Sequence, residues 1–256
     1  MAITSIVGIQ TAAKQSFVIT ATGNASGLDS PRNNWTSNNL VPANVTRFSP
    51  DNTNGLQFKN PIAGQNTYLS DTNIYGVSTS PYYTLIVDVI WGVVVTNTTT
   101  LQTLSSPLMG NRDINGTTRG DGVYLILVNG TGNLGGGTCF LTVTYTSSDG
   151  NTGRIGLSGN AGNFQGGRTT FISLANGDKG VQSVQSAQWS ALPGGGLNLY
   201  AYRPIAIIPG GMARSDGTAA GDALNLALPQ IYDNSCIQFL YGNGAGTRGQ
   251  ISLIQG

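Results

Sequence analysis

Alternating apolar and polar side chains, the period-two pattern of a β-strand, dominate the chain after residue 80. The strongest predicted strand lies at 82–101, and it contains the most apolar run of the chain at 85–95. Its apolar side chains of one parity are Leu85, Val87, Val89, Trp91, Val93 and Val95. The other parity places Ile86 and Ile90 around Asp88, so the run predicts a central strand that is packed on both faces.

Further strand-like segments follow this run, separated by glycine-rich turns at fairly even spacing. They lie at 121–132, 139–146, 167–176, 181–192, 196–208 and 235–244. Such a series predicts an all-β protein with an antiparallel β-sandwich or jelly-roll-like fold. Two stretches fit less well. VQSVQSAQ at 181–188 is apolar at every third position, and 218–233 could begin a short helix at Asp222 that Pro229 ends.

Residues 1–80 have a different character. Asparagine is frequent here, and four prolines interrupt any periodicity: Pro31, Pro42, Pro50 and Pro61. Aromatic residues recur, so the segment is unlike an aromatic-poor disordered tail. We therefore expect 1–80 to form an irregular, extended N-terminal arm with short strands. A β-sandwich core is expected at 81–256, and whether this core divides near residue 138 stays open.

The composition limits the chemistry. Among 256 residues there are 37 Gly and no His, and all 11 acidic residues are Asp. Without histidine, the commonest general base and metal ligand near neutral pH is missing, and Ser-His-Asp or Cys-His catalysis within the chain is excluded. We predict no catalytic, cofactor-binding or metal-binding residues, and a protein that is not an enzyme.

Charge and hydropathy also limit the partners. The formal net charge of +1 implies no general attraction to nucleic acid or to an acidic membrane. The N-terminal sequence MAITSIVGIQ lacks the features of a signal peptide, and the apolar run at 85–95 is too short to span a bilayer. We expect neither nucleic acid nor membrane as a partner. Cys139 and Cys236 lie far apart and are expected to be small buried side chains.

The segment SSDGNTGR at 147–154 permits two interpretations. Asp149 and Asn151 beside glycines resemble part of a calcium loop, but no acidic residue follows within twelve positions of Asp149. The same residues suit a tight turn between two strands, because Gly150 tolerates positive φ. The turn is the favoured interpretation.

Other aspartates invite a functional interpretation. The densest charge cluster is the loop at 110–122, where Asp113 and Asp121 could flank a sugar as the two carboxyls of a glycosidase do. A solvated or subunit-contacting loop is favoured instead. Asp88, within the apolar run, needs a partner if it is buried, and Arg203 in the segment YAYRP is the predicted one.

Aromatic residues offer a candidate contact surface. Tyr200 and Tyr202 share one face of a predicted strand, the geometry of a platform for sugar rings, and Trp35 and Trp189 are further candidates. These side chains would contact either a glycan or another subunit. Burial of the face against a second sheet or a neighbouring subunit is the favoured interpretation.

Four segments follow one another between residues 139 and 256. They are LTVTYTSSDGNTGR, FISLANGDKGVQSVQSAQWS, LNLYAYRPIAIIPGG and DALNLALPQIYDNSCIQFLYGNGAG. This series resembles virion structural proteins of tailed bacteriophages, in which a VTYTNxDGxxGR-like hairpin, a GDxGVxSVQS segment and a YRP strand occur in the same order. The resemblance covers just under half of the chain. It brings no active-site residue with it.

The resemblance implies a β-sandwich that assembles on a phage particle as a capsid decoration (cement) protein. Its expected partner is the phage major capsid protein, whose shell it would bind and stabilise. Its expected location is the capsid surface of the virion, after synthesis in the host cytoplasm. A homo-oligomer is also expected, and a trimer suits the local threefold positions of a shell.

Two other functions stay open. One is a tail or head-fibre adhesin that binds host-surface glycans through Tyr200 and Tyr202. The other, less favoured, is a tailspike that cleaves polysaccharide with a pair of aspartates. No solenoid-like repeat supports it.

Overall fold

The computed structural model describes the larger part of the chain. The described residues are 12–21, 32–33, 47–48, 56, 58–61, 63–76, 83–104, 106, 108–129, 134–135, 137–162, 168–209, 218–222, 228–233, 235–241 and 247–256. Within these ranges there is no helix, and the strands pair in antiparallel fashion. The predicted all-β class is therefore confirmed. Accordingly, the described part contains no helix long and apolar enough to cross a membrane.

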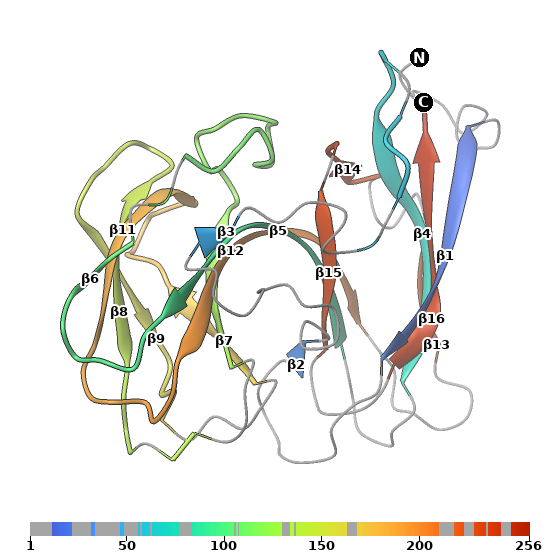
Figure 1. Cartoon of the computed structure of the whole chain (residues 1–256). Coiled ribbons are helices and arrows are strands. Elements are labelled where there is room, and N and C mark those ends of the chain that lie inside the picture. Colours follow the sequence, from blue (N-terminus) through green and yellow to red (C-terminus); the bar gives the residue numbers. More distant parts are fainter. Residues whose placement is uncertain are drawn as a thin grey trace.

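The described residues contain sixteen strands, shown in Figure 1. They are β1 (Ala13–Ala21), β2 (Arg32–Asn33), β3 (Arg47–Phe48), β4 (Thr67–Gly76), β5 (Tyr83–Val95), β6 (Gln102–Thr103), β7 (Tyr124–Val128), β8 (Leu141–Ser147), β9 (Arg154–Ser158), β10 (Thr169–Ser173), β11 (Val181–Trp189), β12 (Leu197–Pro209), β13 (Thr218–Asp222), β14 (Gln230–Ile231), β15 (Cys236–Tyr241) and β16 (Thr247–Gln255).

A five-stranded sheet joins the two ends of the chain. Its order is β1-β16-β4-β13, and β14 also pairs with β4. Only short strands were expected before residue 80, but β1 and β4 are nine and ten residues long. Their serine, threonine and asparagine residues hide the alternation of apolar side chains. The N-terminal part of the chain thus contributes two full strands to a sheet that it shares with the C-terminal part.

Two short strands come from the segment that was expected to be an arm. β2 pairs with β15, and β3 pairs with β5, both within the same chain. Most other residues between 22 and 57, including Trp35, lie outside the described residues. Where it is described, this segment adds strands to the chain's own sheet.

The second sheet has eleven strands. Their order is β2-β15-β5-β12-β7-β10-β9-β8-β11-β6, and β3 pairs with β5. At its centre β5 and β12, thirteen residues each, run antiparallel along their whole length. Figure 1 shows this pair between β6, β8, β9 and β11 on one side and the five-stranded sheet on the other. Both halves of the molecule are therefore built on the same two long strands.

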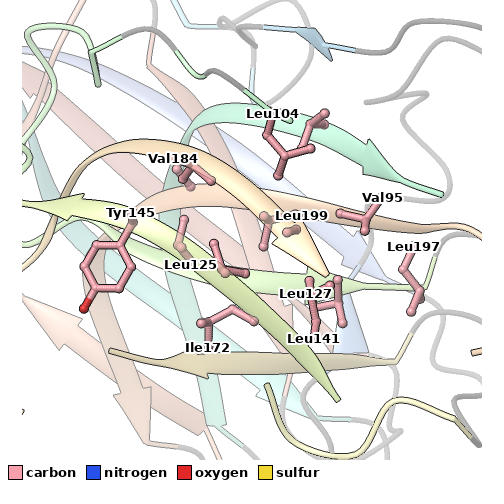
Figure 2. Close-up of a cluster of buried hydrophobic side chains, with 14 of the residues drawn as sticks. Val95, Leu104, Leu125, Leu127, Leu141, Tyr145, Ile172, Val184, Leu197 and Leu199 are labelled. Atoms are coloured by element: carbon pink, nitrogen blue, oxygen red, sulfur yellow. The ribbon is translucent and has the colours of Figure 1, made fainter. Parts of the chain in front are cut away.

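Three clusters of buried apolar side chains hold the sheets together. The largest lies where the eleven-stranded sheet curls over, between β5, β7 and β12 and the strands β8, β10 and β11 (Figure 2). The second lies between the five-stranded sheet and β5, β12 and β15. The third covers the opposite face of β5, β12 and β7. This layered, curled arrangement agrees with the predicted sandwich or jelly-roll-like architecture.

The face predicted for the central strand is correct over only half of its length. Tyr202 pairs with Val89, but the preceding residue Ala201 pairs with Trp91, so β5 advances by two residues where β12 advances by one. This β-bulge reverses the parity, because an extra residue turns the following side chains to the other face. Val89 therefore lies in the third cluster and Trp91 in the largest one.

The period-three segment at 181–188 is a strand, β11, with two bulges. The register to β8 shifts between Val181 and Ser183 and again between Val184 and Ser186. Each shift adds one residue between successive inward positions, so Val181, Val184 and Ala187 are all buried. The spacing that suited neither strand nor helix is the signature of this doubly bulged strand.

Asp222, where a short helix was expected to begin, is the last residue of β13 and pairs with Asp71 of β4. The residues that would continue the helix, 223–227, lie outside the described residues. Pairing with β4 accounts for the extended backbone at Asp222.

Candidate functional site

Asp88 is the centre of a buried ion cluster. Its side chain is fully buried in the middle of β5. Arg203 lies directly opposite in β12, with its Nη2 atom 3.7 Å from Asp88 Oδ2. Arg112, from the loop that precedes β7, places Nη1 3.5 Å from Oδ1. The predicted partner Arg203 is confirmed, and the structure adds Arg112 as a second one.

Hydrogen bonds complete the surroundings of the Asp88 carboxylate. Ser235 Oγ donates to Oδ2 over 2.7 Å, and the Cys236 backbone N–H donates to Oδ1 over 2.9 Å. Both donors come from the start of β15. A buried carboxylate is tolerated when opposite charges and hydrogen-bond donors replace water, and Asp88 has both.

The two arginines of this cluster also have partners of their own. Arg203 Nη2 donates to the carbonyl of Gln230 over 3.0 Å, and its guanidinium lies 4.8 Å from the centre of the Tyr232 ring. Arg112 Nη2 donates to the carbonyl of Val89 over 2.9 Å. Burial lowers the pKa of the Arg203 guanidinium, and the nearby Asp88 carboxylate acts in the opposite direction.

The ion cluster lies between the two main apolar clusters. Ile86, two residues before Asp88, belongs to the second cluster, and Ile90, two residues after it, belongs to the largest. The cluster joins β5, β12, the loop around Arg112 and the start of β15. The ion cluster therefore has a structural role, because both oxygens of Asp88 face donors from the protein itself.

Asp113, a candidate glycosidase carboxyl, is an internal acceptor that shapes its own loop. Oδ1 accepts the backbone N–H groups of Asn115 and Thr117 over 2.9 and 2.7 Å. Oδ2 accepts the Thr117 hydroxyl over 2.6 Å and the N–H groups of Gly120 and Asp121. Burial acts to raise the pKa of Asp113, but these hydrogen bonds outweigh it and hold the pKa below its ordinary value.

The second candidate carboxyl, Asp121, is also engaged within the loop. Its Oδ2 accepts from the Asn115 side-chain amide over 3.2 Å and lies 4.0 Å from Arg119 Nε. Gly120 has a φ of +80° and lies against the carbonyl of Val181, where no side chain would fit. The loop at 110–122 is therefore a hydrogen-bonded structure packed on β11. A solvated or subunit-contacting loop was favoured from the sequence, but Asp113 is a buried internal acceptor and not a solvated group.

Asp178 forms a second polar tie, between the loop after β10 and the β8–β9 hairpin. Tyr145 Oη donates to Asp178 Oδ2 over 2.5 Å, and Arg154 Nε donates to the same oxygen over 2.9 Å. Tyr145 Oη in turn accepts the backbone N–H of Ala175 over 2.8 Å. The hydrogen bond from Arg154 is the main reason why the pKa of Asp178 lies below its ordinary value. Burial, together with Asp178, raises the pKa of Tyr145 to about 12.

The segment around Asp149 is a turn, as favoured. Gly150 N–H donates to the Ser147 carbonyl over 2.9 Å, and Gly150 has a φ of +84°. Asp149 itself is exposed. Among the described residues, no group of three or more His, Cys, Asp or Glu side chains could hold a metal ion. Arg154 forms an ion pair with Asp178, and it does not form a separate site with Asp149.

The predicted aromatic platform is covered. Tyr200 and Tyr202 do share a face of β12, but they are only 1% and 5% exposed and belong to the third apolar cluster. The favoured burial of this face is what the structure shows, and neither ring presents a face to a glycan. The Tyr202 ring contacts Tyr124 and Phe171, each 37% exposed. Trp35 lies outside the described residues.

The remaining singled-out side chains are buried as well. Cys139 and Cys236 are buried thiols that are not joined in a disulfide, and burial raises the pKa of the Cys139 thiol. Trp189 is 2% exposed and donates its indole N–H to the carbonyl of Thr96 over 3.1 Å. These residues serve the interior of the fold.

Sequence reasoning missed three of the polar contacts. Arg112 was noted only as part of a charged loop, and Ser235 as part of a strand. The signal that could have found Arg112 is the acceptor capacity of a carboxylate, because the two oxygens of a buried Asp88 can take more donors than Arg203 alone supplies. For Tyr145 and Asp178, 33 residues apart, no spacing rule indicates a contact.

Comparisons with known proteins do not place the chain in a family. No protein-family model matches the chain, and no curated protein sequence does. Among solved structures, it is similar to the VP2 subviral particle of infectious bursal disease virus, at 8% identity over 95% of this chain and 80% of that chain, with a TM-score of 0.19. A T13 particle of the same virus matches at 11% identity over 94% and 38%, with a TM-score of 0.17. TM-scores this low do not establish a common fold.

Proposed function

We propose that the chain is a non-enzymatic structural protein of a tailed-phage virion, and specifically a capsid decoration (cement) protein. Its partner is the major capsid protein, and its place is the capsid surface. One observation carries the proposal: three charged residues of the phage-like motifs, Arg154, Asp178 and Arg203, form ion pairs that hold the fold together. Arg154 and Asp178 form one tie, and Arg203 with Asp88 forms the other.

These contacts join residues that belong to the motifs on which the resemblance rests. The hairpin motif supplies Tyr145 and Arg154, and the GDKGV motif supplies Asp178, which both side chains contact. The YRP motif supplies Arg203 to the buried Asp88. Motifs that specify a rigid β framework, and no reactive group, suit a protein whose work is to bind a surface and stay folded there.

The proposed action is stabilisation by linkage. A protein that binds the assembled shell, and not its separated subunits, shifts the equilibrium toward the shell by an amount set by its concentration and affinity. Low charge and a folded, antiparallel framework suit this action, because neither long-range steering nor a moving catalytic group is needed.

The test is the number of copies of this chain in purified particles, measured by quantitative mass spectrometry against the major capsid protein. A ratio near one to one is expected for a protein that covers the shell. Particles that lack the chain would overturn the proposal. A handful of copies per particle would also overturn it and would place the chain on a tail or fibre, where the adhesin function would be examined with a glycan array.

A further inference from the structure

Five Asn-Gly pairs occur along the chain, and this dipeptide is the one at which an asparagine side chain most readily loses ammonia. The pairs begin at Asn54, Asn115, Asn129, Asn176 and Asn243. In this reaction the backbone nitrogen of the following residue attacks the side-chain carbonyl carbon, Cγ, and glycine favours the attack because it has no Cβ to obstruct it. The pairs at Asn115 and Asn176 lie wholly within the described residues, and both asparagines are exposed. Their surroundings can therefore be compared directly.

The pair Asn115-Gly116 is held in an unreactive arrangement. The Asn115 side-chain amide donates to Asp121 Oδ2 over 3.2 Å, and the Gly116 N–H donates to the carbonyl of Asp113 over 3.1 Å. Both the amide that would leave and the nitrogen that would attack are engaged within the loop at 110–122. A reaction at Asn115 would have to break these hydrogen bonds first, so the fold protects this pair.

The pair Asn176-Gly177 has neither restraint. It occupies the centre of the turn after β10, which is closed by a hydrogen bond of 3.1 Å from the Asp178 N–H to the Ala175 carbonyl. Among the described residues, neither the Asn176 side-chain amide nor the Gly177 N–H has a hydrogen-bond partner. Nothing lies within 4 Å of the position that a Cβ at Gly177 would take, and its φ of +87° explains why a glycine is present. The attacking nitrogen and the leaving amide are both unhindered.

We infer that Asn176 is a site of spontaneous deamidation in the folded protein. The Gly177 nitrogen gives up its proton through solvent and forms a bond to Asn176 Cγ. The Cγ–Nδ2 bond breaks, and the amide nitrogen leaves with a proton as ammonia. Water then opens the resulting succinimide ring at one of its two carbonyl carbons. The products are aspartate or isoaspartate, and each places a new negative charge at position 176.

This turn also carries the polar tie that joins the loop after β10 to the β8–β9 hairpin. Before Asn176, the Ala175 N–H donates to Tyr145 Oη over 2.8 Å. After it, the Asp178 carboxylate accepts from Tyr145 and Arg154. The Asn176 carbonyl itself accepts from Arg154 Nη2 over 3.2 Å. Three consecutive parts of the turn are therefore anchors of the tie.

Isoaspartate at position 176 changes the geometry of these anchors. The main chain then runs through Cγ and is one methylene longer, so Asp178 shifts relative to the Ala175 N–H. The former carbonyl becomes a free carboxylate that competes with Asp178 for Arg154. Deamidation therefore weakens the tie. This modification goes beyond the proposed function, because it is a property of the free chain and requires no capsid.

The experiment ages the purified full chain in warm, mildly alkaline buffer and follows the two peptides by mass spectrometry after digestion at acidic pH, where little deamidation occurs during preparation. Asn176 is expected to convert at least about tenfold faster than Asn115, the effect of about 1.4 kcal/mol in the activation barrier and of about one hydrogen bond. In urea, where the chain is unfolded, the two rates should become similar. Equal rates in the folded protein, or no conversion of Asn176, would overturn the inference.

A second measurement tests the consequence for the tie. Asn176→Gln keeps an amide at this exposed position, but its longer side chain would have to close a larger ring and reacts slowly. The urea midpoint of the wild type is expected to fall on ageing in step with isoaspartate at position 176, and that of Asn176→Gln to stay constant. Asn115→Gln is the matched control and should lose as much on ageing as the wild type does.

An equal fall of the midpoint in aged Asn176→Gln would show that other damage weakens the protein, and it would overturn the link between deamidation and the tie. Both measurements use the free chain. Their outcome is therefore independent of the copy-number test of the capsid proposal.

Discussion

Asp88 of β5 and Arg203 of β12 are cross-strand neighbours whose charged groups lie 3.7 Å apart in the interior. The pair lies beside the β-bulge at which β5 passes from one apolar cluster to another. A charged pair at this place fixes the register of the two longest strands, since sliding by one residue would leave each charge facing apolar side chains. We propose that the pair specifies how the two halves are aligned.

Replacing Asp88 should destabilise the protein strongly. In Asp88→Ala, two guanidinium groups and the donors Ser235 and Cys236 lose their acceptor, and breaking a buried ion pair typically costs about 3–5 kcal/mol. The measurement is the free energy of unfolding in urea. Asp149→Ala, at an exposed turn position, is the control and should change it by less than about 0.5 kcal/mol.

The same pair can be tested by a double-mutant cycle. Asp88→Ala with Arg203→Met should cost clearly less than the sum of the two single changes, because the second substitution removes a charge that the first has left unpaired. Additive costs would show that the two residues do not act as a unit. They would also remove the argument that this pair aligns the strands.

Asp113 should make stability depend on pH in the acidic range. Its folded-state pKa lies below the ordinary value of 3.8, so the stabilisation is present above about pH 4 and is lost as the pH falls through the folded pKa. Asp113→Asn should lower stability at pH 6 and show a smaller further fall between pH 6 and pH 3 than the wild type. Urea midpoints at the two pH values measure both effects.

A partial variant checks the cause of this pH effect. Thr117→Val removes the hydroxyl that donates to Asp113 Oδ2 over 2.6 Å and leaves the backbone donors in place. The pH dependence of the stability of Thr117→Val should therefore lie between those of the wild type and Asp113→Asn. If the stability of Asp113→Asn falls as much between pH 6 and pH 3 as that of the wild type, other carboxyl groups are responsible for the pH dependence.

The Tyr145 hydroxyl should contribute more to the free energy of unfolding than the hydroxyl of an exposed tyrosine does. Tyr145→Phe keeps the ring in the core but removes a donor to Asp178 and the acceptor of the Ala175 N–H. Leaving such partners unsatisfied typically costs about 1–3 kcal/mol. Tyr124→Phe, at a position that is 37% exposed, is the matched control and should cost less than about 0.5 kcal/mol. Equal effects of the two substitutions would contradict the role of this tie.

Sequence patterns predicted the fold class and the need of Asp88 for a cationic partner because both depend on strong, local signals. No local signal selects Arg203, which lies on another strand far along the chain. A thirteen-residue apolar strand has few alternatives to a central place in a sheet, and a carboxylate within it needs a cation. Bulges are a different matter. The parity error after Val89 and the period-three pattern of β11 both arise from an extra residue, which depends on the partner strand.

The turn at 147–154 implied a strand after it, but the bounds of β9 and the face that it buries escaped prediction for a related reason. RIGLS is short, and its outward Ile155 and Leu157 give the alternation of a core strand with the faces exchanged. Which parity faces inward is decided by Tyr145 and Ile172, which already fill the space above Gly156. Packing of this kind brings together residues that are far apart in the sequence, so the periodicity of one segment cannot predict it.

The last prediction tests that packing directly. Gly156→Ala should destabilise the protein by about 1–3 kcal/mol, the usual cost of adding a methyl group to a filled core. The added Cβ would lie 2.7 Å from Ile172 Cγ2 and 3.3 Å from the Ser173 carbonyl oxygen. Gly137→Ala is the control, because nothing lies within 4 Å of its Cβ position, and it should be neutral or slightly stabilising. Urea unfolding of both variants measures the difference. If Gly156→Ala is as stable as Gly137→Ala, β9 can shift away from Ile172, and the orientation of Ile155 and Leu157 is then not imposed by the core.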